Sequence, residues 1–271
     1  MIILEEDRTI ILHTPKCAGK VLREAFFDIA SKHPFWNWNY LRSTGEWTDR
    51  AHMPLSVMRQ TPEWENIRTY TLIAVVREPG TRFASSLSEH MRQHRKKDAM
   101  AVLKELDETR ICHDPRYIHF IPQNRFTHIG NKRYADFIVR MENLPDDLRA
   151  VGTLCQFSRK FFDAVDQIAL APQKQEEDQD PKVSKKISDI LTRFYLRDYA
   201  LFGYDRTALS DQTPLGFDGL LTDPLCRQEW RGYRAMEPAY ERFTRNIEQD
   251  FLLRQMMAEN KALKAERDKA A

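Results

Sequence analysis

The sequence lacks the features that mark membrane, secreted and metal-binding proteins. It contains no run of about 18 apolar residues, so it predicts no membrane span. Its first residues carry no basic side chain and soon turn acidic, which is not the pattern of a secretory signal. Its 4 cysteines stand far apart without a Cys-x-x-Cys pair, which disfavours a zinc site or a disulfide framework. We therefore expect a cytoplasmic protein that binds no metal.

The charges of the chain show no excess of one sign either. Its 42 Lys and Arg residues nearly balance 40 Asp and Glu residues, which leaves a formal net charge of +2. This balance predicts no general attraction to nucleic acid, so any basic surface must be local. With 42% apolar and 30% charged residues, the composition is ordinary for a globular protein with one sizeable core.

Two parts of the chain share the order strand, loop, helix. In the first, residues 9–13 form an apolar run typical of a buried strand, and apolar positions at helical spacing follow in residues 22–29. In the second, a similar run at residues 70–76 precedes apolar residues at intervals of four in residues 83–91. A third strand is expected at residues 136–141. Strands that alternate with helices predict an α/β fold with a central parallel sheet flanked by helices.

Further helices are expected outside these two units. Apolar periodicity indicates one at residues 100–106 and one at residues 143–162. Residues 173–186 are polar and charged, and they predict a surface loop. Near its end, Ser184 is a suitable N-cap for a helix that carries apolar residues as far as Tyr195.

The loop at residues 14–19, Thr-Pro-Lys-Cys-Ala-Gly, has the chemistry of an anion site. A loop that leads from a strand into a helix presents unpaired N–H groups, Lys16 adds positive charge, and Gly19 allows close approach of the backbone. Lys20 completes the ending of a nucleotide-binding P-loop, but Val21 replaces its metal-binding hydroxyl and the first glycine of that motif is missing. Alone, the loop fits an anion site, a P-loop phosphotransferase or a plain structural turn.

A second loop follows the strand at residues 70–76. Arg77 stands at the end of that strand, and Ser85 stands on the first turns of the next helix. Ligands of open α/β sheets bind at the carboxyl ends of the strands, where an arginine can grip a phosphate and a serine can add a hydrogen bond. Two such corners predict a ligand with two separated anionic groups.

The two loops together carry a family resemblance. Pro-Lys-Cys-Ala-Gly at residues 15–19 and Arg-Glu-Pro-x-x-Arg-x-x-Ser at residues 77–85 resemble the 5′- and 3′-phosphate motifs of sulfotransferases that use 3′-phosphoadenosine-5′-phosphosulfate (PAPS). The similarity is greatest to the Golgi carbohydrate sulfotransferases. Residues 140–144 and 195–204 are similar to two further segments of that family.

The resemblance implies a P-loop-like sulfotransferase domain at residues 1–205. A C-terminal linker and a long helix are expected at residues 206–271, since residues 231–269 are rich in helix-forming residues. The apolar stripe of that helix suits a packing arm or a coiled-coil seam between the two copies of a homodimer.

The resemblance also implies roles for individual residues. Lys16 is expected to contact the oxygen that bridges phosphorus and sulfur, while Arg77 and Ser85 hold the 3′-phosphate. Lys20 and Val21 replace the family's usual hydroxyls, so Lys20 is expected to supply charge instead. The implied reaction is in-line transfer to an acceptor hydroxyl, expected to belong to a saccharide, without a metal. The residues expected around the 5′-phosphosulfate are Pro15, Lys16, Cys17, Ala18, Gly19, Lys20 and Val21.

The acceptor hydroxyl needs a base, and His52 is the candidate. It lies between the two loops in the sequence, and an imidazole accepts a proton near neutral pH. The alternative is that His52 is a packing or surface histidine, and Glu24 and Glu46 are weaker candidates for the base. The other histidines considered are expected to be structural or solvated: His13, His90, His94, His113, His119 and His128.

Some interpretations stay open at this point. The basic run at residues 92–97 is expected to be a solvated helix face, with binding of an acidic polysaccharide as the alternative. Residues 123–126, Gln-Asn-Arg-Phe, are suited to contact with the acceptor or with the adenine of the donor. For the whole chain, the alternatives are a P-loop-type phosphotransferase and a non-catalytic module that binds an anionic nucleotide or glycan.

Overall fold

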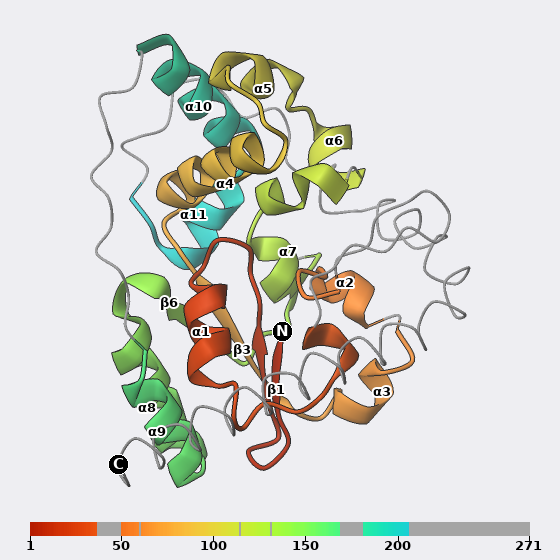
Figure 1. The fold of residues 1–271 in the computed structure, drawn as a ribbon, viewed down its shortest axis with the longest axis vertical. Coiled ribbons are helices and arrows are strands. Elements are labelled where there is room, and N and C mark those ends of the chain that lie inside the picture. Colours follow the sequence, from red (N-terminus) through yellow and green to blue (C-terminus); the bar gives the residue numbers. More distant parts are fainter. Residues whose placement is uncertain (37–49, 60, 114, 131, 169–180, 206–271) are drawn as a thin grey trace, which may run out of the picture.

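A four-stranded sheet forms the centre of the fold, which we describe from a computed structural model (Figure 1). The residues that it describes are 1–36, 50–59, 61–113, 115–130, 132–168 and 181–205. The strands are β1 (Ile2–Leu4), β2 (Thr9–Leu12), β3 (Thr71–Val76) and β6 (Phe137–Arg140), and they lie in the order β1-β2-β3-β6. β2, β3 and β6 are parallel, whereas β1 is antiparallel to β2.

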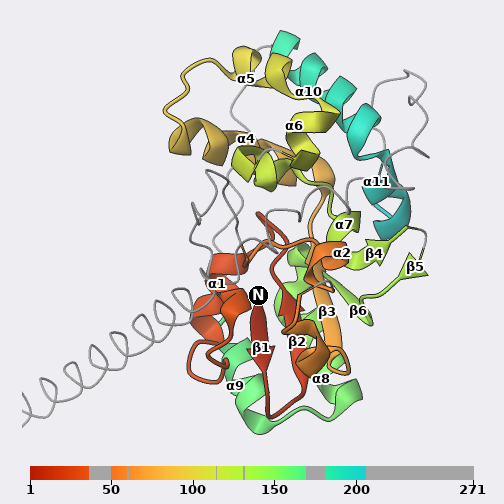
Figure 2. The same cartoon turned by 90° about the vertical axis from the view of Figure 1, so that its right-hand side faces the viewer.

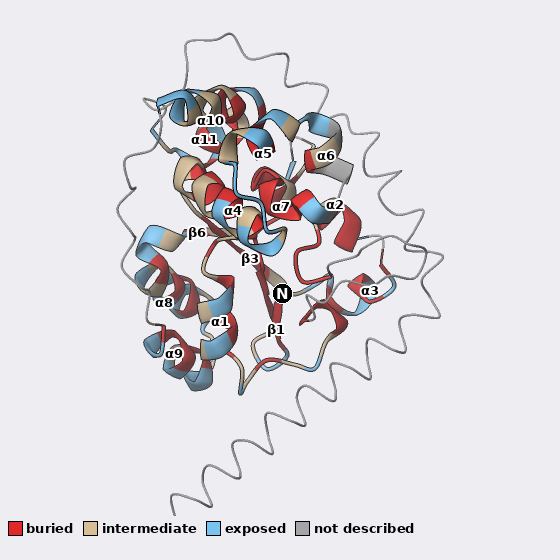
Figure 3. Cartoon of the chain, turned by 45° about the horizontal axis from the view of Figure 1, so that its top comes forward, coloured by how far each residue is buried: buried red, intermediate tan, exposed pale blue. Residues whose placement is uncertain are grey.

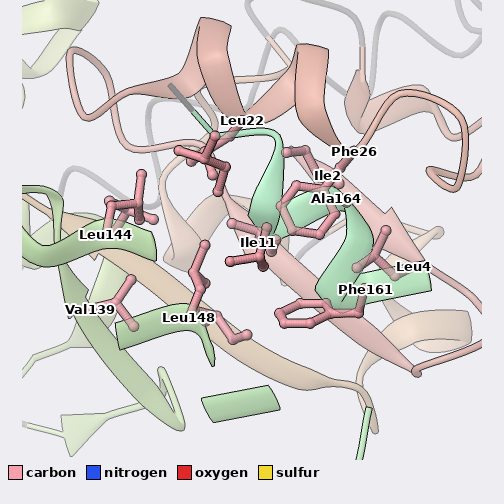
Figure 4. Close-up of a cluster of buried hydrophobic side chains, with 14 of the residues drawn as sticks. Ile2, Leu4, Ile11, Leu22, Phe26, Val139, Leu144, Leu148, Phe161 and Ala164 are labelled. Carbon is pink, nitrogen blue, oxygen red and sulfur yellow. The ribbon is translucent and has the colours of Figure 1, made fainter. Parts of the chain in front are cut away.

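The strands alternate their side chains between two apolar layers. Ile11, Ile73 and Val75 face the helices α1 (Gly19–Ala25), α8 (Leu144–Cys155) and α9 (Arg159–Asp166), and Figure 4 shows part of this core. Ile10 and Leu72 face the opposite side, where the short helices α2 (Leu55–Met58), α3 (Trp64–Ile67) and η1 (Pro34–Trp36) lie. The sheet is thus covered on both faces: β1 and β2 are buried, β3 is buried except at its first residue, and Figure 3 shows β1 and β3 mostly in the colour of buried residues.

A third apolar core lies beyond the carboxyl ends of the strands. It joins α4 (Pro79–Gln93), α5 (Ala99–Glu105), α6 (Glu108–His113), η2 (Pro115–Phe120), α10 (Pro181–Phe194) and α11 (Leu196–Phe202). Figure 2 shows this helical layer above the upper ends of the strands. The remaining elements are η3 (Met141–Asn143), α7 (Asn124–Thr127) and the hairpin of β4 (His128–Ile129) and β5 (Lys132–Arg133).

The structure confirms the predicted α/β class and corrects several elements. The expected helix at residues 143–162 is two helices, because Gln156 adopts a left-handed φ of 56° and ends α8. Ser158 then caps α9. Ser184 caps nothing: α10 already begins at Pro181, so residues 181–186 of the predicted loop are helical. The antiparallel strand β1 was not predicted.

Two further predictions concern membrane spans and the C-terminal residues 206–271. No helix within the described residues is long and apolar enough to cross a membrane. The expected linker and long helix at residues 206–271 lie outside the described residues, so the division into two regions and the homodimer stay predictions.

Candidate functional site

The two predicted loops meet at one edge of the sheet. The first loop, residues 13–18, joins β2 to α1, and the second loop, residues 77–78, joins β3 to α4. β2 and β3 are neighbouring parallel strands, and Leu12 at the end of β2 pairs with Ala74. Both loops therefore start from carboxyl ends of adjacent strands, which is where open α/β sheets bind ligands.

The first loop has an unusual backbone. Lys16 and Ala18 adopt left-handed φ angles of 65° and 59°, which cost non-glycine residues on the order of 1 kcal/mol each. Left-handed residues on both sides of Cys17 are typical of backbone nests that bind anions. The N–H groups of residues 18–21 donate to no other described residue. The first turn of α1 thus keeps its hydrogen-bond donors open.

Gly19 is required by the close approach of a side chain. A Cβ atom at this position would lie 1.6 Å from Nε2 of His13 and 2.1 Å from its Cδ2. No side chain fits there unless the imidazole moves. Gly19, the first residue of α1, therefore lets the helix start lie against His13, in addition to any approach to a ligand.

Lys16 is held toward helix α4. Its Nζ lies 3.5 Å from Oε2 of Glu89, and the Lys16 side chain is 23% exposed. Glu89 also accepts a hydrogen bond from Nε of Arg92 at 3.3 Å. Partial burial raises the pKa of Glu89, but the hydrogen bond from Arg92 and the charge of Lys16 outweigh it and lower that pKa. Glu89 thus stays ionised and orients the lysine ammonium.

The second loop is closed by hydrogen bonds. The carboxylate of Glu78 caps α4 by accepting from the N–H groups of Gly80 at 2.8 Å and Thr81 at 2.6 Å. Tyr199 donates to the same carboxylate at 2.9 Å, and Glu142 accepts from the Glu78 N–H at 2.8 Å. Because a carboxylate already fills this helix N-terminus, the loop can offer an anion its side chains only.

Arg77 supplies that side chain. It is half-buried, and its Nε is buried without a hydrogen-bond partner among the described residues. A buried guanidinium N–H without a partner is costly, which makes it a candidate for an anionic ligand. Ser85 lies half-buried on α4, two turns further on.

Gln123 joins the two loops. Its Oε1 accepts from the N–H of Arg77 at 2.8 Å and from Sγ of Cys17 at 3.3 Å, and its Nε2 donates to the Arg77 carbonyl at 2.8 Å. The Gln123 N–H donates to Asp198 at 2.7 Å, and both residues are fully buried. Gln123 thus braces the two loops against each other, and contact of residues 123–126 with the acceptor or the adenine of the donor stays a prediction.

Three histidines gather beside the first loop. The His52 ring lies 4.3 Å from the ring of His13 and 5.4 Å from that of His119, measured between centroids, and all three are buried. Burial lowers the pKa of His119 to about 2, with His52 and Lys16 adding to the shift, and burial lowers the pKa of His13 well below its usual value. The structure thus brings the predicted base to the first loop, together with His119, which the sequence did not single out.

Comparison with known proteins gives one match. A family model described as "Sulfotransferase family" matches residues 1–205 of the 271. The chain belongs to the sulfotransferase family. No curated protein and no solved structure gives a significant match, so the membership rests on this model. Family membership indicates sulfuryl transfer to a hydroxyl acceptor in general terms.

Other predicted residues of this sulfotransferase have distinct environments. The Pro15 carbonyl accepts from Nη1 of Arg82 at 3.4 Å. Cys17 is buried, which raises its thiol pKa to about 12 and leaves it without nucleophilic character. Lys20 is exposed and Val21 is half-buried on α1. Glu24 points to solvent on the same helix.

Glu46, the other weaker candidate for the base, lies outside the described residues. Within the described part of the chain, no group of His, Cys, Asp and Glu side chains has the arrangement of a metal site.

Proposed function

We propose that this sulfotransferase takes its sulfuryl group from PAPS and transfers it to a hydroxyl of a carbohydrate. One observation carries the proposal: Gln123 ties together two loops that each hold a cation, Lys16 in the first and Arg77 in the second. A ligand with two separated anionic groups matches this arrangement, and the 5′-phosphosulfate and 3′-phosphate of PAPS are such a pair.

The open N–H groups of the first loop suit the 5′-phosphosulfate. Residues 15–21 are proposed to surround it, with Lys16 at the bridging oxygen and Lys20 as a second cation. Arg77 and Ser85 are proposed to bind the 3′-phosphate by side chains, since Glu78 already fills the helix N-terminus beside them.

The reaction follows from these positions. The acceptor oxygen attacks sulfur, the bond from sulfur to the bridging oxygen breaks, and adenosine 3′,5′-bisphosphate leaves. Lys16 neutralises the charge that develops on the leaving oxygen, and His52 takes the acceptor proton. His13 and His119 flank His52 as neutral imidazoles and hold its ring in place. The scheme uses no metal.

Two measurements test the proposal. Calorimetry of the wild-type protein should detect binding of adenosine 3′,5′-bisphosphate, and labelled PAPS should transfer its sulfuryl group to a member of a panel of sugars, lipids and phenols. No binding of the bisphosphate would sink the choice of donor. Transfer to lipids or phenols alone would refute the carbohydrate acceptor.

His52 has its own test. His52→Ala should bind the bisphosphate normally but lose about 10²–10⁴-fold in turnover, the usual contribution of a general base. His90→Ala, which removes a buried histidine that packs against Tyr117 and Phe120 of the third core, is the matched control and should keep its turnover. Equal turnover in His52→Ala and the control would remove His52 from the mechanism.

A further inference from the structure

The hairpin of β4 and β5 gathers cations from three parts of the chain. Lys132 and Arg133 form β5, Arg59 ends α2, and Arg197 belongs to α11. We call these four residues the basic hairpin surface. Arg59, Lys132 and Arg133 are exposed, and Arg197 is half-buried. Figure 2 shows the hairpin beside α2, with α7 and α11 above it.

Contacts within this surface fix the cations in place. The Arg59 guanidinium lies 4.5 Å from the centre of the Tyr134 ring, and Nζ of Lys132 lies 5.1 Å from the same point. Arg197 donates from Nη2 to the Gly130 carbonyl at 2.6 Å, which ties the hairpin to α11. Cation–π contacts of this kind hold two positive groups against one ring without neutralising them.

The basic hairpin surface has little counter-charge. None of its four cations forms an ion pair with a described residue. Burial lowers the pKa of Arg197; its neighbour Asp198 opposes that shift, and Arg125 adds to it. Burial also lowers the pKa of His128 to about 4, with Arg197 and Arg133 adding to the shift. Positive charges therefore accumulate here, which favours an anionic partner.

The basic run that is visible in the sequence behaves differently. In residues 92–97, Arg92 pairs with Glu89, and Lys96 lies 3.9 Å from Glu105. The run is thus partly neutralised by carboxylates of α4 and α5. The basic hairpin surface therefore has more unneutralised positive charge for an anion than residues 92–97 have.

The position of the surface connects it to the reaction. α2 packs against both α7 and β4, and it starts at Leu55, three residues after His52. Arg59 stands at the other end of this one-turn helix. We propose that the basic hairpin surface binds the carboxylate or sulfate groups of an anionic polysaccharide acceptor, next to the place where its hydroxyl reacts. This inference rests on the proposed function, because it names the class of the acceptor.

A glycan fits this surface better than a single-stranded nucleic acid does. Proteins that bind single strands stack the bases on open aromatic faces. In the basic hairpin surface the aromatic ring is Tyr134, and it carries two cations against it. The surface therefore offers point charges for carboxylates and sulfates rather than a stacking platform.

The test uses two triple variants of the full chain with equal loss of charge. Arg59→Ala/Lys132→Ala/Arg133→Ala removes the exposed part of the surface, and Arg95→Ala/Lys96→Ala/Lys97→Ala removes three exposed cations from the basic run. Fluorescence anisotropy measures binding of a labelled, desulfated uronic-acid oligosaccharide at low and high salt. Neutral dextran and an oligothymidylate of similar length are the comparison ligands. Calorimetry of adenosine 3′,5′-bisphosphate checks the donor site.

The wild-type protein should bind the uronic-acid oligosaccharide, more weakly at high salt, and should not bind dextran. The hairpin variant should lose about tenfold in affinity and the control less than twofold, with bisphosphate binding intact in both. Equal losses in the two variants, equal binding of dextran, or a preference for the oligothymidylate would overturn the inference. If the wild-type protein did not bind adenosine 3′,5′-bisphosphate, that result would instead refute the proposed donor.

Discussion

The two loops at the edge of the sheet differ in what they offer to an anion. The first loop leaves the N–H groups at the start of α1 open and uses left-handed backbone at Lys16 and Ala18 to present them. The second loop fills the start of α4 with the Glu78 carboxylate and offers Arg77 instead. In the proposed function, the first loop binds the donor through its backbone and the second loop binds it through a side chain, which predicts different responses to substitution.

Removing the charge of the first loop should have the largest effect. Lys16→Ala should lower turnover about 10²–10³-fold, the scale for losing one group that stabilises a leaving oxygen, while bisphosphate affinity falls much less because the N–H groups remain. Rapid-quench assays with labelled PAPS and calorimetry separate the two quantities. If Lys16→Ala lost only bisphosphate affinity and kept its turnover, the proposed role of Lys16 at the leaving oxygen would be wrong.

Removing the charge of the second loop should act on affinity. Arg77→Ala should weaken bisphosphate binding about 10–100-fold, because charged hydrogen bonds to the 3′-phosphate are lost, with little change in turnover at saturating donor. Arg77→Lys keeps the charge and should restore part of the affinity. Unaltered binding in Arg77→Ala would leave the second loop without a donor role.

Gly19 and Gly80, near the starts of α1 and α4, allow the packing around the two loops to be compared. Gly19→Ala places a Cβ 1.6 Å from His13 and should destabilise the fold by about 1–3 kcal/mol. In Gly80→Ala the nearest atoms are Glu78 oxygens at 3.2 Å, so the change should be within about 0.5 kcal/mol. Urea unfolding measures both, and similar losses would show that the first loop is no more tightly packed than the second.

The buried His119 beside the first loop should also make stability depend on pH. The pKa of His119 is about 2 in the folded protein and about 6.5 when unfolded, so the unfolded state gains the proton first as pH falls. This contribution is complete above pH ~6.5 and declines below it, by about 2 kcal/mol at pH ~5. Between pH ~6.5 and pH ~5, the melting temperature should fall more in the wild type than in His119→Asn. An equal fall in both proteins would contradict this account.

A smaller loss of stability is expected at the cap of the second loop. Glu78→Ala removes the acceptor for two N–H groups and should cost about 1 kcal/mol of stability. The emptied helix start resembles that of α1, so a sulfate ion should stabilise this variant more than the wild type. Thermal melts with and without sulfate measure both effects, and identical responses to sulfate would mean that the cap does not exclude anions.

Local patterns predicted much of the fold. The three parallel strands were predicted because continuous apolar runs are typical of strands buried on both faces. β1 escaped notice because three residues are too few to show a period. The break between α8 and α9 depends on one left-handed residue, Gln156. Glutamine has no preference for that conformation, so the residue type does not predict the break.

The chemistry of the two loops follows from local sequence, because each loop is a short contiguous segment with its own charge and its own place after a strand. The contacts between and around the loops depend on the tertiary structure. Gln123 joins the loops, His119 joins His52, and Arg59 joins Lys132 across the ring of Tyr134. These pairs are far apart in the sequence, so no local pattern or spacing encodes their contact.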